Sequence, residues 1–465
     1  MTRSVKVGQL QKFRRGMYRS LGHRRDALFE MIDATSCGGA ADSLPHLSLL
    51  SIHQRRHGSV YAALREGTLN VPQFRGALVR HPLAGGLPAY AVDVSVIARC
   101  DAEASPGRAY YHHPSRHSAG QPIVAGWAYS WVAQLGSERS SWTAPVDAVR
   151  LAPGERPEAV AIRQVQALAP LMTSGPVPLF VFDGGYSPSL LTVALAETRA
   201  AVLVRFGDDR VFFRSAQPRA RGHGGRPQRH GAAFRCGDAS TWGEPDIWLE
   251  ELDAMCGRVE VRCWSGLHGR VGHGPGKGLG RGRGPTQPLA FGWVVRVTLD
   301  RAPNQARPLK PLWLWYAGPA LPDPQLVWRA YVHRFDVEHT LRFCKERLGW
   351  DRARVRTPEQ MDSWTWLVLA GYAQLRLARR LVADRRLPWE RPRPVGQLTP
   401  WRVLRGFRDL VWILGTPASA PKPCGRSPGR PRGSRSGPAR RDTRVERAQH
   451  RDRSEACTTG VFASP

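Results

Sequence analysis

Paired cysteines, long apolar runs and lysine are all scarce in this sequence of 465 residues. The eight cysteines form no Cys-x2-Cys pair, which argues against a zinc ribbon and against a disulfide framework. No apolar run approaches the ~20 residues of a membrane-spanning helix, and no apolar signal-peptide segment follows the basic N-terminus. A P-loop pattern is also missing. We therefore expect free thiols, a cytoplasmic protein and no membrane partner.

Positive charge is abundant, because 68 Lys and Arg residues face only 38 Asp and Glu residues, for a formal net charge of +30. This excess is far beyond what solubility requires and implies a polyanionic partner. Nucleic acid is the first candidate, since no segment has the lipid-facing apolar stripe of a peripheral membrane helix. We therefore expect DNA as the partner and association with the nucleoid.

The pattern of apolar residues changes several times along the chain and predicts an α/β protein. A basic, helical first region is expected to bind DNA ends, and alternating strands and helices then predict a sheet covered on both faces. A β-rich stretch with glycine-rich basic loops follows, and helical patterns return after it. We expect a helical region at 1–85, the first part of the α/β core at 86–206 and a β-rich insertion at 207–320. The second part of the core, with the C-terminal helices, is expected at 321–415, and a tail at 416–465.

The tail from Thr416 to Pro465 has eleven Lys and Arg against four Asp and Glu, and it is rich in Pro, Gly and Ser. Such a composition predicts disorder. Within it, Gly429-Arg-Pro-Arg-Gly433 is similar to an AT-hook, in which Arg430 and Arg432 would enter the minor groove of DNA. A plain polycationic tail is the alternative, and either would add salt-sensitive affinity for DNA.

The most specific motif runs from Tyr331 to Lys345 and predicts one helix. At 100° per residue, Tyr331, Arg334, Glu338 and Lys345 fall within an arc of roughly 60°. Only six lysines occur in the chain, so a chance match to this spacing has a probability of roughly one in a thousand. One carboxylate beside two cations and a phenol suits a metal ion and a phosphate held together. The alternative is a solvated face with an ordinary (i, i+4) ion pair.

Two aspartates upstream sit in positions that call for a partner. Asp93 lies in the middle of the apolar strand 89–97, where an unpaired charge costs several kcal/mol. Asp183 ends the apolar strand before Gly184-Gly185, at the edge where open α/β sheets bind ligands. An ion pair for Asp93 and a simple turn for Asp183 are the alternatives. Asp101 and Asp147 remain substitutes for Asp93.

The Tyr-x2-Arg-x3-Glu-x6-Lys spacing resembles the YREK signature of bacterial insertion-sequence DDE transposases that form hairpin intermediates. The segment Val181-Phe-Asp183-Gly-Gly-Tyr186 is similar to the Asp-x-Gly-Tyr segment around the second acid of that group. The resemblance implies a ribonuclease-H-like core interrupted by a β-rich insertion, which would account for the long interval between Asp183 and Glu338.

The same resemblance implies roles for individual residues. Asp93, Asp183 and Glu338 would be catalytic and would bind two Mg²⁺ or Mn²⁺ ions, while Tyr331, Arg334 and Lys345 would hold DNA phosphates. We add Arg342 to this phosphate-binding group because it lies on the same face of the predicted helix. The reaction would be cut-and-paste cleavage and strand transfer, with the element's terminal inverted repeats and the target DNA as partners of a homodimer. The alternatives are a nuclease that does not join ends and a transposase-derived protein that only binds DNA.

Overall fold

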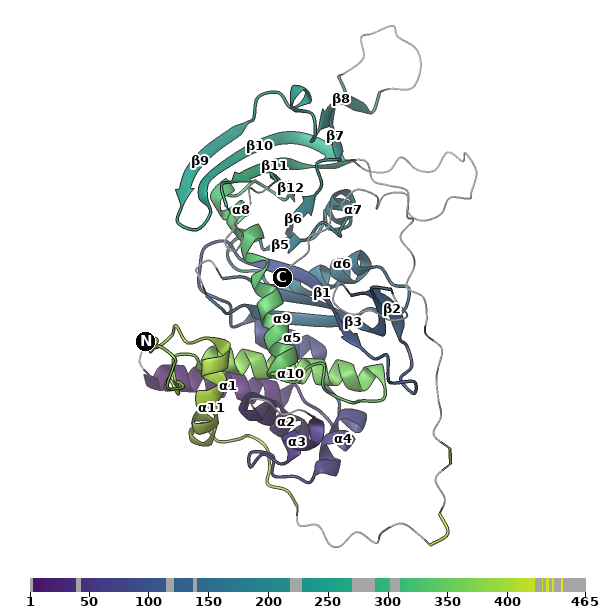
Figure 1. Ribbon diagram of the computed structural model, residues 1–465, viewed down its shortest axis with the longest axis vertical. Coiled ribbons are helices and arrows are strands. Elements are labelled where there is room, and N and C mark those ends of the chain that lie inside the picture. Colours follow the sequence, from purple (N-terminus) through teal and green to yellow (C-terminus); the bar gives the residue numbers. More distant parts are fainter. Residues whose placement is uncertain are drawn as a thin grey trace.

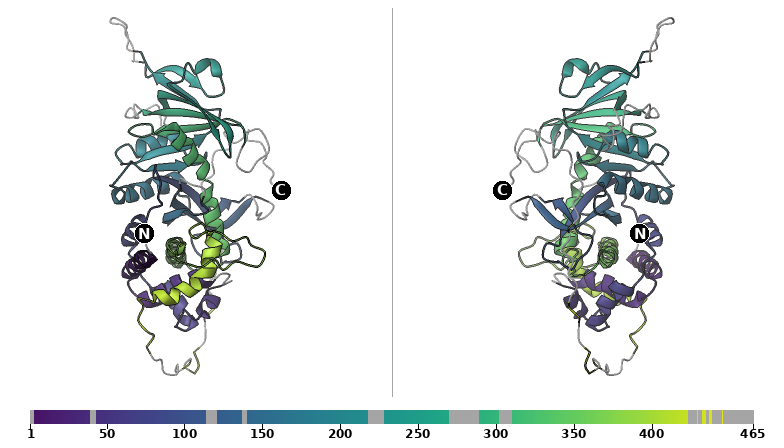
Figure 2. Two further views of the ribbon diagram at one scale, coloured as in Figure 1. Left: turned by 90° about the vertical axis from the view of Figure 1, so that its left-hand side faces the viewer. Right: turned by 90° about the vertical axis from the view of Figure 1, so that its right-hand side faces the viewer.

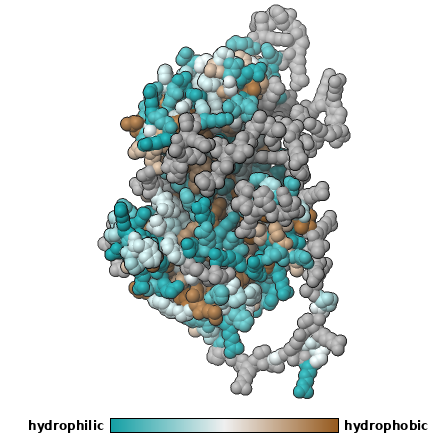
Figure 3. All heavy atoms as spheres, in the orientation of Figure 1, coloured by the Kyte–Doolittle hydropathy of each residue, from teal (hydrophilic) through white to brown (hydrophobic). Residues whose placement is uncertain are grey.

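The computed structural model describes residues 3–38, 43–113, 121–136, 140–217, 228–269, 289–301 and 310–422, with a few isolated residues of the tail. The molecule is elongated, with helices gathered at one end and β-hairpins at the other (Figures 1 and 2). One apolar core runs through nearly all of it. Hydrophilic side chains dominate the face shown in Figure 3, and the hydrophobic ones there form small separate groups.

The helical end combines the two ends of the described chain. Helices α10 (Pro358–Ala378) and α11 (Pro400–Leu414) pack against the N-terminal helices, and α10 is buried along most of its length. A capping box of Thr357 and Gln360, with Pro358 in the first turn, fixes where α10 begins. The N-terminal helices are α1 (Arg3–Arg19), α2 (Arg25–Gly38), α3 (Leu44–Ser48), α4 (His57–Glu66) and α5 (Val71–Val79).

A buried polar network centred on Arg14 joins these helices. Its guanidinium, on α1, donates to Asp33 Oδ2 of α2 at 2.9 Å, to Gln374 Oε1 of α10 at 2.8 Å and to the carbonyl of Gly415 at 2.8 Å. Only 2 % of Arg14 is exposed. Arg14 is one of the arginines that make the first region basic in sequence, but helix packing buries its charge against Asp33, so it adds no charge to the surface.

Twelve strands of the described residues form one mixed sheet, which confirms the predicted α/β class. Their order is β2-β3-β1-β5-β6-β12-β11-β10-β7-β8, with β4 paired to β3 and β9 paired to β10. Strands β1, β5 and β6 are mutually parallel. The strands are β1 (Ala89–Ala98), β2 (Ala109–His112), β3 (Ile123–Gln134), β4 (Ala144–Arg150), β5 (Leu179–Phe182), β6 (Ala201–Phe206), β7 (Val211–Ser215), β8 (His230–Arg235), β9 (Ile247–Asp253), β10 (Gly257–Gly269), β11 (Ala290–Leu299) and β12 (Leu312–Ala317).

The β-rich stretch between residues 207 and 320 continues this sheet. Strand β12 pairs with the core strand β6 through five antiparallel positions, and β11 and β10 follow outward. Helices α6 (Pro157–Leu168) and α7 (Pro188–Ala194) pack on the sheet, α6 against β3 and α7 against β6 (Figure 1). The β-hairpins are therefore tied by backbone hydrogen bonds to β6, which pairs with β5 just before Asp183, and β5 pairs in turn with β1, which carries Asp93.

Six of the eight cysteines lie in the described part of the chain and are free thiols, five of them buried. No helix among the described residues is long and apolar enough to cross a membrane.

Candidate active site

Strand pairing brings Asp93 and Asp183 side by side. Strands β1 and β5 are parallel neighbours with Ala91 opposite Val181, and extending this register by two residues sets Asp93 level with Asp183. Adjacent strands lie about 4.8 Å apart, and positions in the same register project from the same face. Asp93 Oδ1 accepts a hydrogen bond from its neighbouring Val94 amide, and Asp183 Oδ1 accepts one from the Gly185 amide at 2.9 Å. Both carboxylates thus project from neighbouring positions on the same face of the sheet.

The motif from Tyr331 to Lys345 spans two helices, so the prediction of a single helix is wrong. Helix α8 (Pro324–His333) ends before Arg334, and α9 (Asp336–Glu346) begins after Phe335. Across this junction the backbone amides of Arg334, Val337 and Glu338 bond to carbonyls three residues back, which tightens the turn. Helix α9 packs against β1. Glu338 therefore sits in the first turn of α9, beside the strand that carries Asp93.

Arg334 lies between the acids. Its Nη1 atom is 3.9 Å from Asp93 Oδ1, and its Nη2 atom is 3.9 Å from Glu338 Oε1. The Arg334 side chain is 6 % exposed and the Glu338 side chain is 52 % exposed. Burial lowers the pKa of Arg334, but attraction to Tyr331 and to the three acids outweighs it and leaves the pKa raised. One buried guanidinium therefore faces three carboxylates.

The excess of negative charge acts on Asp93. Burial raises the pKa of Asp93 to about 6, and repulsion from Asp183 and Glu338 adds to this, against the lowering effect of Arg334. An ionised Asp93 is therefore disfavoured unless further positive charge is supplied.

Two phenols beneath the cluster lack hydrogen-bond partners in the described part of the chain. The hydroxyls of Tyr331 and Tyr186 are both buried and unpaired. Burial, followed by repulsion from Asp183 and Asp93, raises the pKa of Tyr186. Tyr331 stacks edge-on against Phe335, and the Arg334 guanidinium lies over both rings. Tyr331 is thus a packing support for Arg334 in this conformation, whereas it was expected to contact phosphates.

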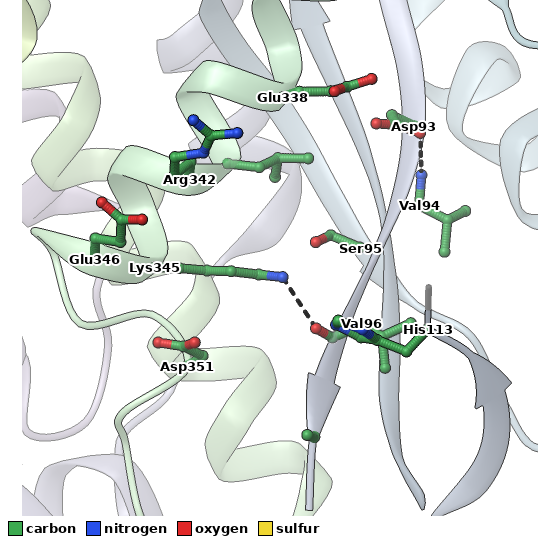
Figure 4. A pocket seen from close by; sticks show the side chains of 12 residues that line it. Asp93, Val94, Ser95, Val96, His113, Glu338, Arg342, Lys345, Glu346 and Asp351 are labelled. Atoms are coloured by element: carbon green, nitrogen blue, oxygen red, sulfur yellow. Dashed lines mark hydrogen bonds between the residues drawn. The ribbon is translucent and has the colours of Figure 1, made fainter. Parts of the chain in front are cut away.

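An open pocket of about 440 Å³ extends from the acids along α9. Figure 4 shows Glu338 and Asp93 at one end, on opposite walls made by α9 and β1. Lys345 crosses the pocket, its Nζ 3.1 Å from the Val96 carbonyl oxygen and 5.7 Å from the centre of the Trp350 ring. Arg342 also lines the pocket and is exposed. Arg342 and Lys345 therefore follow Asp93 and Glu338 along the pocket.

Ser95 and His113 line the same pocket, and the sequence analysis missed both. Ser95 stands two residues after Asp93 on β1, so strand alternation was the signal that could have found it. His113 follows β2 and reaches the pocket only through the pairing of β2 with β3. Its position in the sequence carries no such signal.

The two substitutes for Asp93 are engaged elsewhere. Asp147 is fully buried and bonded to Arg75 Nε at 2.8 Å and to Gln164 at 3.1 Å. Asp101 is exposed and pairs with Arg354 at 2.6 Å. Of the two tail arginines, Arg432 is an exposed turn residue and Arg430 lies outside the described residues.

The donor set fits a hard divalent cation. Three carboxylates against one guanidinium leave negative charge to be neutralised, and carboxylate oxygens are the ligands that Mg²⁺ and Mn²⁺ prefer. Within the described ranges, no group of three or more His, Cys, Asp or Glu side chains is close enough together to hold a metal ion. Arg334 lies between Asp93 and Glu338, and Glu338 is half-exposed, so these acids would have to draw closer to share an ion.

The chain belongs to the DDE superfamily endonucleases, whose family model matches residues 16–269, more than half of the sequence. The matched segment contains Asp93 and Asp183 and ends before Glu338.

Among solved structures, a piggyBac transposase in a synaptic complex with hairpin DNA is similar at a TM-score of 0.36 and 9% identity. The similarity covers 75% of this chain and 65% of that chain, so this protein spans less than two thirds of the transposase's length. No curated protein matches the sequence.

Proposed function

We propose that the protein is a DNA transposase of the hairpin-forming insertion-sequence group, acting by a cut-and-paste route. The observation that carries the proposal is the β1–β5 register, which when extended sets Asp93 level with Asp183. Arg334 then links Asp93 to Glu338, lying 3.9 Å from each. The strand order β4-β3-β1-β5-β6 supports a ribonuclease-H-like core, since three antiparallel strands are followed by two that are parallel to β1.

Asp93, Asp183 and Glu338 would hold two Mg²⁺ or Mn²⁺ ions. Such ions activate an attacking oxygen and neutralise the charge that develops on the leaving oxygen. The raised pKa of Asp93 supports this role, because an acid that is costly to ionise alone gains most from a bound cation.

The neighbouring cations would hold the DNA backbone. Lys345 and Arg342 line the pocket beyond Glu338, where their side chains can meet phosphates next to the scissile bond. Arg334 is more deeply buried and would keep Asp93 and Glu338 apart until the ions bind. Tyr331 would act through Arg334, because its hydroxyl is buried.

The DNA substrates would be the element's terminal inverted repeats and a target site. Cutting two ends in concert favours a homodimer on paired ends. The basic regions 1–85 and 416–465 would add affinity for DNA, although Arg14 contributes no charge to that surface. A protein with these partners would act in the cytoplasm, associated with the nucleoid.

The test is a cleavage assay with DNA carrying the element's terminus, in Mg²⁺, analysed on a denaturing gel. Wild type is compared with Glu338→Gln, which keeps the size of the side chain and removes the charge. Glu346→Gln is the matched control, because Glu346 lies in the same helix, lines the same pocket and is exposed.

Nicks and hairpins from wild type and Glu346→Gln, but not from Glu338→Gln, are the expected result. Nicks that never mature into joined products would indicate a nuclease without transfer activity. Binding of terminal DNA by wild type without any cleavage would refute the enzymatic role.

A further inference from the structure

The connection between α10 and α11 carries an unusually exposed tryptophan. We define residues 384–397 as the Trp389 loop. Trp389 is 78% exposed and Val395 is 74% exposed, while Leu387 is at 36%. An exposed indole forgoes the favourable free energy of burial, and tryptophan is enriched where a partner covers it. The loop therefore presents an apolar tip that nothing in the described chain covers.

The loop is held in place by specific hydrogen bonds. The Glu390 carboxylate accepts from the Leu387 amide at 2.7 Å and from the Arg405 guanidinium of α11. Asp384 accepts from the Arg393 amide at 3.2 Å and from Arg402 Nη1 at 2.9 Å. These contacts fix both sides of the loop on α11, so the exposed position of Trp389 is a built feature of the fold.

Exposed arginines surround the tip. Arg385, Arg386, Arg391 and Arg393 are all exposed, whereas both acids of the loop are used in its internal contacts. Of the four, Arg385 forms an ion pair, with Asp409. In the described structure the other three have no carboxylate partner, and the surface next to Trp389 is therefore strongly positive. An aromatic side chain among arginines suits a polyanion with accessible flat rings.

The first turn of α11, which follows the loop, lies next to the end of the helix that carries Glu338. Arg347, directly after α9, sits 4.3 Å from the centre of the Trp401 ring, and Arg405 sits 5.6 Å from it. Trp401 is in the first turn of α11, a few residues after the loop. Glu338 and Arg347 are separated by roughly 14 Å along α9, or about four base steps of DNA. A DNA backbone held by Arg342 and Lys345 can therefore lead toward the start of α11, which the loop precedes in the chain.

We propose that the Trp389 loop binds DNA in which bases are accessible, with Trp389 stacked on an unpaired base and the loop arginines on the adjoining phosphates. This inference rests on the proposed function, since it takes DNA as the ligand. Duplex backbone contacts alone would need arginines but no protruding indole. A polyanion also accounts better than a protein partner for three arginines that lack a carboxylate partner in the described structure.

The test measures equilibrium binding of fluorescent DNA in EDTA, so that cleavage does not contribute. The probes are a single-stranded oligothymidylate and a duplex, each of about 20 nucleotides or base pairs, which exceeds a typical single-strand site. Trp389→Ala is expected to weaken binding of the single strand about 5- to 150-fold, as for loss of one stacked base, and to leave the duplex within about twofold. Trp389→Phe should restore most of the lost affinity, because it retains an aromatic face.

Trp412→Ala is the matched control, because Trp412 is 55% exposed on α11 but has no comparable group of arginines beside it in the sequence. It should leave binding of both probes unchanged. Arg391→Ala with Arg393→Ala should weaken both probes and reduce the dependence on salt by about 0.7 per lost single-strand phosphate contact.

Unchanged single-strand binding by Trp389→Ala would overturn the inference, whatever the cleavage assay shows. A change in sedimentation of Trp389→Ala, without a change in DNA binding, would also overturn it and identify the loop as a protein contact. Trp389-dependent single-strand binding by a protein that never cleaves terminal DNA would sustain the inference and refute the proposed function.

Discussion

Asp93→Asn should make the protein more stable at neutral pH while abolishing cleavage. The shift in the pKa of Asp93, from 3.8 to about 6, spans about two units. Each unit corresponds to about 1.36 kcal/mol, so the ionised carboxylate costs up to about 3 kcal/mol in the absence of metal. Because the Asp93 side chain retains 20 % exposure, solvent relieves part of this cost, and we expect a gain of about 1–3 kcal/mol.

The pH dependence gives the prediction its sign. A carboxyl group whose pKa is raised in the folded state binds its proton more tightly there than in the unfolded chain. Stability therefore falls as pH rises from about 4 to about 6, and the cost is fully present above pH 6. The advantage of Asp93→Asn should be largest above pH 6 and should disappear toward pH 4.

The assay is urea unfolding in EDTA above and below this interval, with wild type and variant compared at each pH. Asp101→Asn is the matched control, since its exposed pair with Arg354 contributes less than about 1 kcal/mol. Added Mn²⁺ should stabilise wild type but not Asp93→Asn. A variant that is no more stable than wild type above pH 6, or whose advantage persists near pH 4, would refute the reasoning.

Three further predictions concern other parts of the molecule. Arg14→Met should lower the free energy of unfolding by about 3–5 kcal/mol because it leaves Asp33 buried without its cation, while Arg15→Met, at an exposed neighbour, should change it by less than about 0.5 kcal/mol. Equal effects of the two changes in urea unfolding would contradict this. Lys345→Met should lower the slope of log K against log salt for duplex binding by about 0.9, as for one lost phosphate contact, and an unchanged slope would exclude Lys345 from the DNA interface. Burial, then the nearby arginines and Lys12, lowers the pKa of His81 to about 4, so stability is lost as pH falls from 6.5 toward 4. His81→Phe should reduce this acid-induced loss in the free energy of unfolding by up to about 3 kcal/mol. Acid unfolding curves of the variant that superimpose on those of wild type would exclude His81 as the cause.

The sequence predicts features of the site that depend on local pattern. The apolar strand around Asp93 and the apolar run before Asp183 were enough to single out the two aspartates, because each strand is defined by its own residues. The break between α8 and α9 could not be found this way. Arg334 and Phe335 continue a 3.6-residue period in the sequence, yet the backbone amides there bond to carbonyls three residues back.

Long-range contacts account for the remaining differences. Arg14 looks like a surface cation in the sequence, since its partner Gln374 is 360 residues away along the chain. The prominence of Trp389 is equally hidden, because a lone tryptophan is more often buried than exposed. Its exposure depends on hydrogen bonds that Glu390 and Asp384 make to α11.

The hydrogen bond from Arg14 to the Gly415 carbonyl joins α1 to the residue that follows α11, so the packing of α1 depends on a much later part of the chain. During synthesis, the Arg14 side chain lacks this partner until Gly415 has left the ribosome, so we expect the N-terminal helices to complete their packing only then. A gene copy interrupted before α11 would then yield an unstable fragment, cleared by proteolysis, rather than a folded binder competing for the same DNA ends. Truncated gene copies would therefore produce no stable protein, and so no inhibitor of the full-length protein made from intact copies.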